Sequence, residues 1–204
     1  HPGAGRPDGT LQNALLHRYP QTARLDRGGL VHRLDKDTSG LMVVALSERA
    51  QLRLVEAMSS RKIRREYDAL VNGLVTASGS VRAAIGRHPR DRTKMTVLAS
   101  GRPAVSHYRV LERFLHHTHL RVKLETGRTH QIRVHMSYKR HPVLGDPIYG
   151  GRPQRGAGLP EGLRQKIAAF PRQALHAREL EFVHPITGAH LTFVREPPAD
   201  FRDL

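Results

Sequence analysis

Residues 31–42 read Val-His-Arg-Leu-Asp-Lys-Asp-Thr-Ser-Gly-Leu-Met and place a carboxylate, Asp35, among apolar neighbours. The apolar run 41–45 follows, so we expect Asp35 at a turn between two buried extended segments. A buried carboxylate must be paired, neutralised or used, because removing it from water is costly. With an Arg beside it the charged form is favoured, and such a carboxylate is a usable nucleophile or general base. For an Asp taken alone, a structural salt bridge is the commoner explanation.

Two further segments combine charge with apolar neighbours. Residues 64–67 read Arg-Arg-Glu-Tyr, and on pattern alone Tyr67 is a strand aromatic that packs in the core. Residues 124–133 read Leu-Glu-Thr-Gly-Arg-Thr-His-Gln-Ile-Arg. A strand, a Gly turn and a helix start suit contact with an anion, because free amides point outward there. Taken alone, Arg128 and Arg133 are solvated charges of a turn and of a helix.

The three blocks together resemble the motifs of the RNA pseudouridine synthases of the A/D type, which are named for the large ribosomal subunit, and they occur in the order that this family uses. The resemblance implies that Asp35 is the catalytic aspartate, that Tyr67 packs against the target base and that Arg133 forms an ion pair with Asp35. A base stacked on an aromatic ring gains ~1–3 kcal/mol. The Tyr67 hydroxyl would also lie near C5 of the base, from which a proton must leave.

The resemblance implies roles for four more residues. The Arg matching Arg33 fills the stack vacated by a flipped nucleotide, and on a strand Arg33 would point the same way as Asp35. Leu175 resembles the apolar residue that lines the uracil pocket, although plain core packing is nearly as common. Arg128 and His130 are expected to contact RNA or to support the site.

Connecting stretches also fit the D branch of this family. Residues 141–150 look architectural, with Gly and Pro fixing a loop behind the site. The other matching stretches are 1–3, 87–89, 94–95, 103–108, 150–153 and 197–198. Such enzymes usually carry an N-terminal S4-type RNA-binding domain and a first strand motif, which this sequence lacks, and it starts with His. We therefore expect residues 1–204 to be one catalytic domain of a longer protein.

The implied reaction is the isomerisation of uridine to pseudouridine, in which an N1–C1′ bond is exchanged for a C5–C1′ bond. It needs no cofactor, metal or energy donor. The uridine must first be flipped out of structured RNA, at a cost of a few kcal/mol. Asp35 would then attack C1′ or C6, or remove a sugar proton, and the sequence leaves these routes open. A large-subunit rRNA stem-loop is the expected substrate, with tRNA as the alternative.

The charge balance points to a polyanionic partner. The chain has 34 Lys and Arg against 18 Asp and Glu, a formal charge of +16. RNA fits better than a membrane surface, because no apolar run approaches the roughly 20 residues of a spanning helix. We expect a cytoplasmic monomer.

Two alternatives from other classes stay open. A non-catalytic RNA-binding module for ribosome assembly would share the basic surface but form no pseudouridine. A metal-dependent nuclease would need a cluster of acidic ligands, which the sequence lacks. The chain has no Cys, and the spacing of His116, His117 and His119 matches no zinc template. We therefore expect no metal site.

The predicted elements give an α+β fold with a mixed, mostly antiparallel sheet flanked by helices. Ser39-Gly40 is a predicted turn. Predicted helices begin at caps Thr10 and Ser47, at Thr129 and at Pro160, the second with Leu52, Val55 and Met58 inward. Predicted strands include residues 41–45, the alternating segments around 67–71 and 120–124, and a hairpin over 175–194.

Overall fold

The computed structural model describes residues 8–150 and 158–204. The matches at 1–3 and 151–153 lie outside the described residues. The chain divides into two compact units. Among the described residues, the first unit holds 8–34, 42–63 and 181–193, and the second holds 35–41, 64–150, 158–180 and 194–204.

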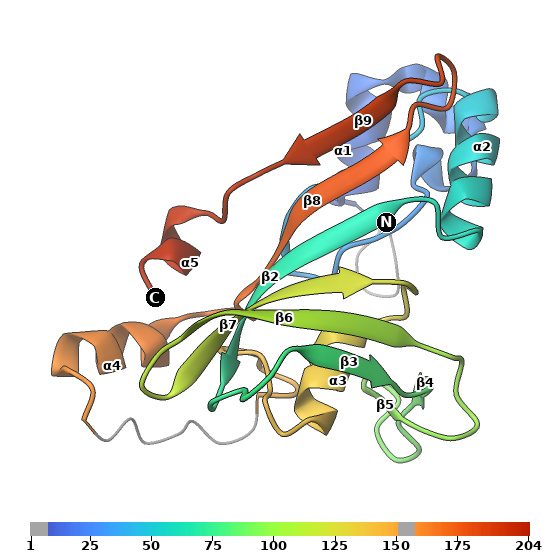
Figure 1. The fold of residues 1–204 in the computed structure, drawn as a ribbon. Coiled ribbons are helices and arrows are strands. Elements are labelled where there is room, and N and C mark those ends of the chain that lie inside the picture. The colour runs from blue at the N-terminus through green and yellow to red at the C-terminus, as the bar shows by residue number, and fades with distance from the viewer. Residues whose placement is uncertain (1–7, 151–157) are drawn as a thin grey trace. The chain divides into compact units, whose positions relative to one another are not determined.

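The strands of a seven-stranded sheet follow the order β1-β8-β2-β7-β6-β3, with β9 paired to β8. Figure 1 labels all of these strands except β1. The pairs β2–β7, β7–β6 and β6–β3 are antiparallel, whereas β1 runs parallel to β8. The predicted mixed, mostly antiparallel sheet is therefore confirmed. The strands of this sheet are β1 (Ser39–Gly40), β2 (Arg64–Asn72), β3 (Gly79–Arg82), β6 (Val105–Arg113), β7 (His117–Leu124), β8 (Leu175–Val183) and β9 (His190–Val194). The last two contribute residues to both units.

The remaining elements are a small hairpin and several short helices. The hairpin pairs β4 (Ile85–Arg87) with β5 (Met95–Val97). The helices are α1 (Leu11–Arg18), η1 (Pro20–Arg24), η2 (Asp26–Gly29), α2 (Glu48–Ser59), α3 (Gln131–Tyr138), α4 (Glu161–Ala169) and α5 (Ala199–Arg202). The predicted caps are confirmed, since the side chains of Thr10 and Ser47 accept bonds from the backbone amides of Asn13 and Ala50.

The pleat of β2 gives the central sheet one apolar and one charged face. Tyr67 lies opposite Val122 on β7, and Ala69 lies opposite Leu120; all four are buried. Residues of alternate register point the other way. There Asp68 is 1% exposed.

Asp68 is the acidic centre of the charged face. Its carboxylate accepts a bond from Arg121 Nε at 2.8 Å and lies 3.7 Å from Arg178 on β8. Burial opposes ionisation of Asp68, but His119 and Arg121 outweigh it and hold the pKa of Asp68 below its ordinary value.

The predicted strand 41–45 is wrong. Only an isolated antiparallel bridge forms there, between Leu30 and Val44. The Leu41 amide donates to Ala177 O at 2.9 Å, but the amide of Val43 donates to His32 Nε2 and that of Ala45 donates to Gly29 O, so the segment does not continue as a ladder. Residues 31–35 form no strand either.

The turn predicted at Ser39-Gly40 is displaced. These two residues form β1, and the turn precedes them, with the Thr38 amide donating to Asp35 O at 3.1 Å. Asp37 takes a positive φ of 67° in this turn, a conformation that Asp tolerates better than most side chains.

The predicted inward face of α2 is also wrong. Ala50 and Leu54 are buried, whereas Leu52 is 73% and Val55 48% exposed. Both sets have helical spacing, and the stripe four residues apart is the one that packs. Met58 is half-buried.

A buried hydrogen-bond network fixes α3 against β6. Helix α3 begins at Gln131 rather than at Thr129, because His130 before it has a left-handed backbone with φ 56°. The Gln131 side chain accepts bonds from Thr126 Oγ1 and the Arg128 amide. The same side chain donates to Ser106 Oγ, which also lies 2.9 Å from His135 Nδ1. With His135 Nε2 donating to Ala83 O, its Nδ1 accepts the Ser106 proton, and the neutral ring satisfies every partner.

This network predicts acid sensitivity. Burial lowers the pKa of His135, although the bond to Ala83 O opposes the shift. The unfolded chain therefore binds a proton below about pH 6.5 that the folded chain does not bind, so stability falls as the pH falls. Between pH 7 and pH 5 the unfolding free energy of His135→Gln should therefore decrease less than that of the unaltered protein. The difference between the two slopes should reach at most about 1.4 kcal/mol per pH unit.

Urea denaturation at several pH values measures this effect. His190 is exposed on β9, so His190→Gln is the matched control and should keep the pH dependence of the unaltered protein. If the unfolding free energy depended on pH equally in both variants, the pH dependence could not be assigned to His135.

Candidate active site

The guanidinium of Arg133 on α3 joins two carboxylates from distant parts of the chain. Its Nε and Nη2 donate to Asp146 Oδ2 and Oδ1 at 2.7 and 2.8 Å, and its Nη1 donates to Asp35 Oδ2 at 3.2 Å. The side chains of Arg133 and Asp146 are 3% and 0% exposed, and that of Asp35 is 14% exposed. Burial opposes the charge of Arg133, but Asp146 and Asp35 together raise its pKa. A fixed cation therefore orients a carboxylate that keeps one side accessible.

Asp146 is the residue that the sequence analysis missed. It lies in the segment 141–150, which we expected to be architectural. Its Oδ1 also accepts the amides of Ile148 and Tyr149, at 2.9 and 3.0 Å. One signal was available: Asp146 is the only acidic residue in the basic stretch 126–160.

The segment that carries Asp35 is held by residues just before β8. Gln173, 2% exposed, donates to Lys36 O at 2.6 Å and to Thr38 Oγ1 at 2.9 Å. Arg172 adds a bond to Asp37 O at 3.3 Å. Both ends of the Asp35 turn are thereby tied to the residues that lead into one strand.

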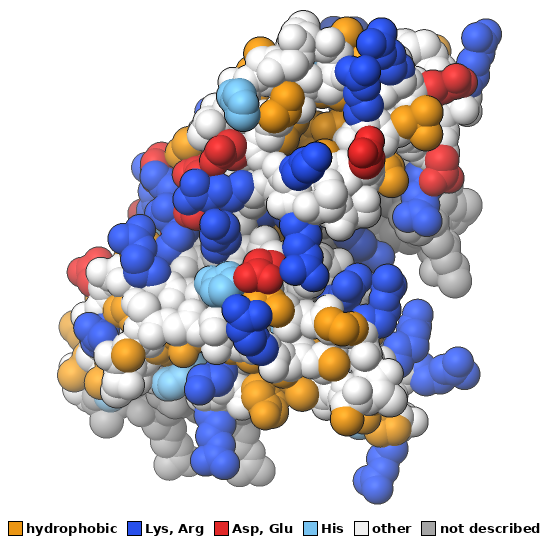
Figure 2. Space-filling view, turned by 45° about the vertical axis from the view of Figure 1, so that its right-hand side comes forward, with side chains coloured by type: hydrophobic (Ala, Val, Ile, Leu, Met, Phe, Trp, Pro, Cys, Tyr) orange, Lys and Arg blue, Asp and Glu red, His pale blue; other side chains and the backbone are white. Residues whose placement is uncertain are grey.

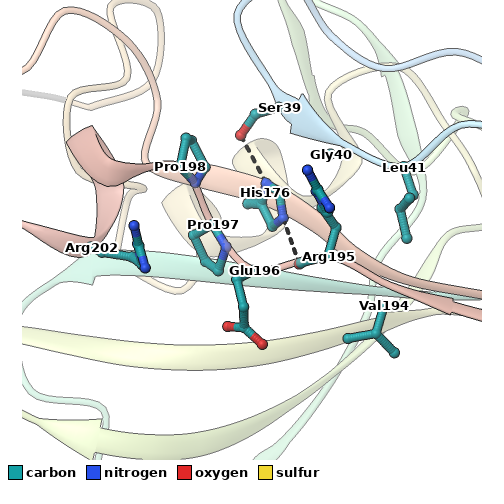
Figure 3. Close-up of a pocket in the computed structure, with 10 residues that line it drawn as sticks. All are labelled: Ser39, Gly40, Leu41, His176, Val194, Arg195, Glu196, Pro197, Pro198 and Arg202. Carbon is teal, nitrogen blue, oxygen red and sulfur yellow. Dashed lines mark hydrogen bonds between the residues drawn. The ribbon is translucent and has the colours of Figure 1, made fainter.

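β1 continues this attachment along β8. Gly40 has φ 114°, and a Cβ there would lie 2.2 Å from Ala177 O, so only Gly permits this approach. Ser39 Oγ lies 2.9 Å from His176 Nδ1, and His176 Nε2 lies 2.9 Å from Arg195 O (Figure 3). Burial lowers the pKa of His176, which suits a neutral ring that accepts from Ser39 and donates to Arg195.

An open cavity of about 730 Å³ lies along this attachment. Figure 3 shows His176 at its centre, between Ser39 and the C-terminal segment that carries Arg195 and Pro198. Its lining includes none of the predicted site residues. The cavity is therefore a feature separate from the Asp35–Arg133 pair.

Tyr67 lies within electrostatic reach of Asp35. The ring is 7% exposed on β2. Burial raises the pKa of its hydroxyl; Arg65 opposes this rise, and the negative charge of Asp35 adds to it. Tyr67 is thus a neutral aromatic group near the Asp35–Arg133 pair.

Tyr149 and His130 complete the wall around Arg133. The Arg133 guanidinium lies over the Tyr149 ring, with Cζ 5.1 Å from the ring centre. The Tyr149 hydroxyl lies 2.8 Å from His130 Nδ1 and accepts the Met95 amide at 2.9 Å. Burial raises the pKa of Tyr149. His130 therefore contacts the same tyrosine on which the Arg133 guanidinium packs.

Three predicted site residues remain: Leu175, Arg128 and Arg33. Leu175 is 3% exposed at the start of β8, two residues after Gln173. Arg128 donates from Nε to Pro103 O at 3.0 Å. Arg33 belongs to the first unit and is exposed. Because it lies in no strand, the expectation that strand alternation aligns it with Asp35 is wrong.

Basic side chains dominate the charged groups on the face shown in Figure 2, with Asp and Glu interspersed among them. Within 8–150 and 158–204, no three His, Asp or Glu side chains are grouped so that they could hold a metal ion. No helix in the same ranges is both long and apolar enough to cross a bilayer.

Comparisons with known proteins agree on one family. The sequence profile described as RNA pseudouridylate synthase matches residues 7–138. The chain is 58% identical over 200 residues to the ribosomal large subunit pseudouridine synthase D of Vibrio parahaemolyticus, covering 98% of this chain and 62% of the relative. It is 54% identical over 204 residues to the protein of the same name from Escherichia coli K12, covering 100% and 63%. The chain thus spans less than two thirds of the length of these curated relatives.

Two solved human structures are similar. Human RNA Pseudouridylate Synthase Domain Containing 1 superposes with a TM-score of 0.70 and 28% identity, covering 93% of this chain and 74% of the other. Human RNA Pseudouridylate Synthase Domain Containing 4 gives a TM-score of 0.67 and 29% identity, covering 85% and 72%.

The bidentate pair predicts a large stability effect for Asp146→Asn. The amide keeps an oxygen for the Ile148 and Tyr149 amides but leaves Arg133 with a buried, half-compensated charge. We expect a loss of about 3–5 kcal/mol in the free energy of unfolding, measured by urea denaturation. Asp26→Asn, which removes an exposed carboxylate, is the control and should leave stability unchanged. A loss for Asp146→Asn as small as that of the control would show that the pair does not hold this loop.

Proposed function

The chain belongs to the RNA pseudouridylate synthase family, and from this premise we propose that it isomerises uridine to pseudouridine in large-subunit ribosomal RNA. The observation that carries the proposal is the Arg133 guanidinium shared by Asp146 and Asp35. Asp146 takes the two-bond contact and is fully buried. Asp35 is bound by one nitrogen, so one of its oxygens is left for a substrate.

Asp35 is the proposed catalytic residue. Arg133 orients it through the bond from Nη1 to Oδ2, and the exposed side of the carboxylate stays open to a substrate. Asp35 would form a bond to C1′ or C6 of the target nucleotide, or remove a sugar proton to give a glycal-like intermediate. In the first two routes the N1–C1′ bond breaks, C5 bonds to C1′, and the bond to Asp35 breaks in turn. In the third route the removed proton returns to the sugar as C5 bonds to C1′. In each route the C5 proton then leaves.

The base would be held between Tyr67 and apolar side chains. Stacking on Tyr67 is sequence-tolerant and worth ~1–3 kcal/mol. We assign Leu175 to the same pocket, because it is buried and immediately follows the residues that anchor the Asp35 turn. Arg33 is the proposed substitute for the flipped uridine in the RNA stack, and its exposure leaves it free to enter RNA.

The proposed substrate is a stem-loop of large-subunit rRNA. Support comes from the names of the relatives from Vibrio parahaemolyticus and Escherichia coli and from the formal charge of +16. Phosphate contacts by Arg and Lys supply most of the affinity in such complexes. Arg128 is a proposed RNA contact, and His130 is a proposed support for Arg133. The proposed place of work is the cytoplasm, where bacterial ribosomes form.

Asp35→Asn should abolish the reaction without abolishing RNA binding. The fold should persist, because Arg133 keeps its two bonds to Asp146. We expect the release of tritium from transcripts carrying 5-tritiated uridine to fall at least about 10³-fold, while the Kd for the transcript changes only several-fold. Asp37→Asn removes the same charge two residues away, at an exposed turn position that also suits Asn, and should keep full activity.

Each alternative gives a different result in this assay. Full turnover by Asp35→Asn would overturn the assignment of the catalytic residue. A binding-only module would form no pseudouridine in the unaltered protein, although it would still bind with a steep salt dependence. A nuclease would cut the transcript in a chelator-sensitive way. Preferential reaction with tRNA transcripts would redirect the proposed substrate.

A further inference from the structure

Arg65 on β2 is a buried cation that the catalytic assignments above leave unused. The residue is 8% exposed, and its Nε is shielded from solvent without a hydrogen-bond partner in the described part of the chain. Burial lowers its pKa, and the neighbouring Tyr67 hydroxyl partly opposes this shift. Isolated buried charges are costly, so such a group in a native structure calls for a reason.

The position of Arg65 connects it to the proposed site. Residues 65 and 67 point to the same face of β2, separated by two residues of about 3.3 Å each. The guanidinium packs on Gly127, just after β7, where a Cβ would lie 2.7 Å from Arg65 Nη1. The absence of a side chain at Gly127 therefore creates the space that the guanidinium occupies. Burial raises the pKa of Tyr67, Arg65 opposes this rise and Asp35 adds to it, so both charged groups are within electrostatic range of its hydroxyl.

We propose that Arg65 binds a carbonyl oxygen of the target uracil and stabilises the negative charge that develops on the base when it leaves the sugar. This inference rests on the proposed function. Breaking the N1–C1′ bond leaves its electron pair on N1, delocalised onto O2 and O4. The sugar carbon is balanced by the bond to Asp35 or by loss of a proton to it. A fixed buried cation is the kind of group that favours such a charge.

Burial favours a base oxygen over a phosphate. Phosphates lie on the outside of an RNA strand and are met by exposed, flexible cations, such as the many Arg and Lys on the surface. Arg65 instead lies beneath the surface, beside the ring on which the base is proposed to stack. The negative charge that forms on that base during the reaction would therefore lie closer to the Arg65 guanidinium than any phosphate of the RNA.

The adjacent residue provides a matched control. Arg64 is 44% exposed on the opposite face of the same strand and binds Glu66 through Nε at 3.0 Å. Arg65→Gln and Arg64→Gln thus make the same chemical change on two faces. In single-turnover tritium release, Arg65→Gln should react about 100-fold or more slowly, and Arg64→Gln should be little changed. Arg65→Lys keeps the charge and should recover part of the rate.

RNA binding separates the proposed role from a phosphate contact. For Arg65→Gln we expect an unchanged Kd and an unchanged slope of log K against log salt. A phosphate contact would instead weaken binding, reduce the slope by about 1 and leave the single-turnover rate intact, which would overturn the proposal.

A substrate with a better leaving group separates charge stabilisation from a structural role. Fluorine at C5 stabilises the uracil anion, so the deficit of Arg65→Gln should be several-fold smaller for consumption of 5-fluorouridine than for uridine. An equal deficit with both substrates would overturn the proposal. Thermal unfolding should show no loss of stability, because the substitution removes an uncompensated buried charge.

Gly127→Ala tests the same contact while keeping Arg65. The added methyl group meets the movable end of the Arg65 side chain rather than backbone, so the fold should persist while the guanidinium shifts. We expect Gly127→Ala to lower the single-turnover rate of tritium release. The double variant with Arg65→Gln should react no more slowly than Arg65→Gln alone. Additive losses would contradict the proposal. An unaltered protein that releases no tritium would instead refute the proposed function itself.

Discussion

The sharing of one guanidinium between two carboxylates is the interaction on which the site depends. Arg133 contacts Asp146 through two nitrogens and Asp35 through the third. Because the fully buried Asp146 compensates the charge of Arg133, Asp35 is free to remain partly exposed. In a single Arg–Asp pair the one carboxylate could either be buried to compensate the Arg charge or be exposed to a substrate, but not both. The third charge removes that conflict.

The sequence predicted the features that depend on near neighbours. The caps at Thr10 and Ser47, the alternation of β2 and β7 and the α+β class follow from local pattern, and all are confirmed. The predicted strand 41–45 failed because only its first amide, that of Leu41, bonds to a strand, whereas those of Val43 and Ala45 bond to His32 and Gly29. The face of α2 was wrong because two apolar stripes were available and only tertiary packing selects one.

Only part of the site could be predicted, because some of its residues are identified by local motifs and others only by contacts made in the folded chain. Motif resemblance pointed to Asp35 and Arg133, and the structure brings these two together. Asp146 was missed, because a loop acid reveals its partner only when the loop is folded back on α3. Arg65 had no distinguishing signal in a run of four basic residues among five, and only its burial separates it from Arg64.

The attachment of residues 36–41 to β8 has a consequence for biosynthesis. Lys36 and Gln173 are 137 positions apart, and the bonds that Arg172, Gln173 and Ala177 make to residues 36–41 all join distant parts of the chain. Contacts so distant along the chain form slowly, because a long loop must close, at a cost in chain entropy, before the contacts can stabilise it. Asp35 is therefore synthesised well before the residues that fix its turn in place. A nascent chain that ends before residue 172 would lack these anchors, so the Asp35 turn would not be fixed in position.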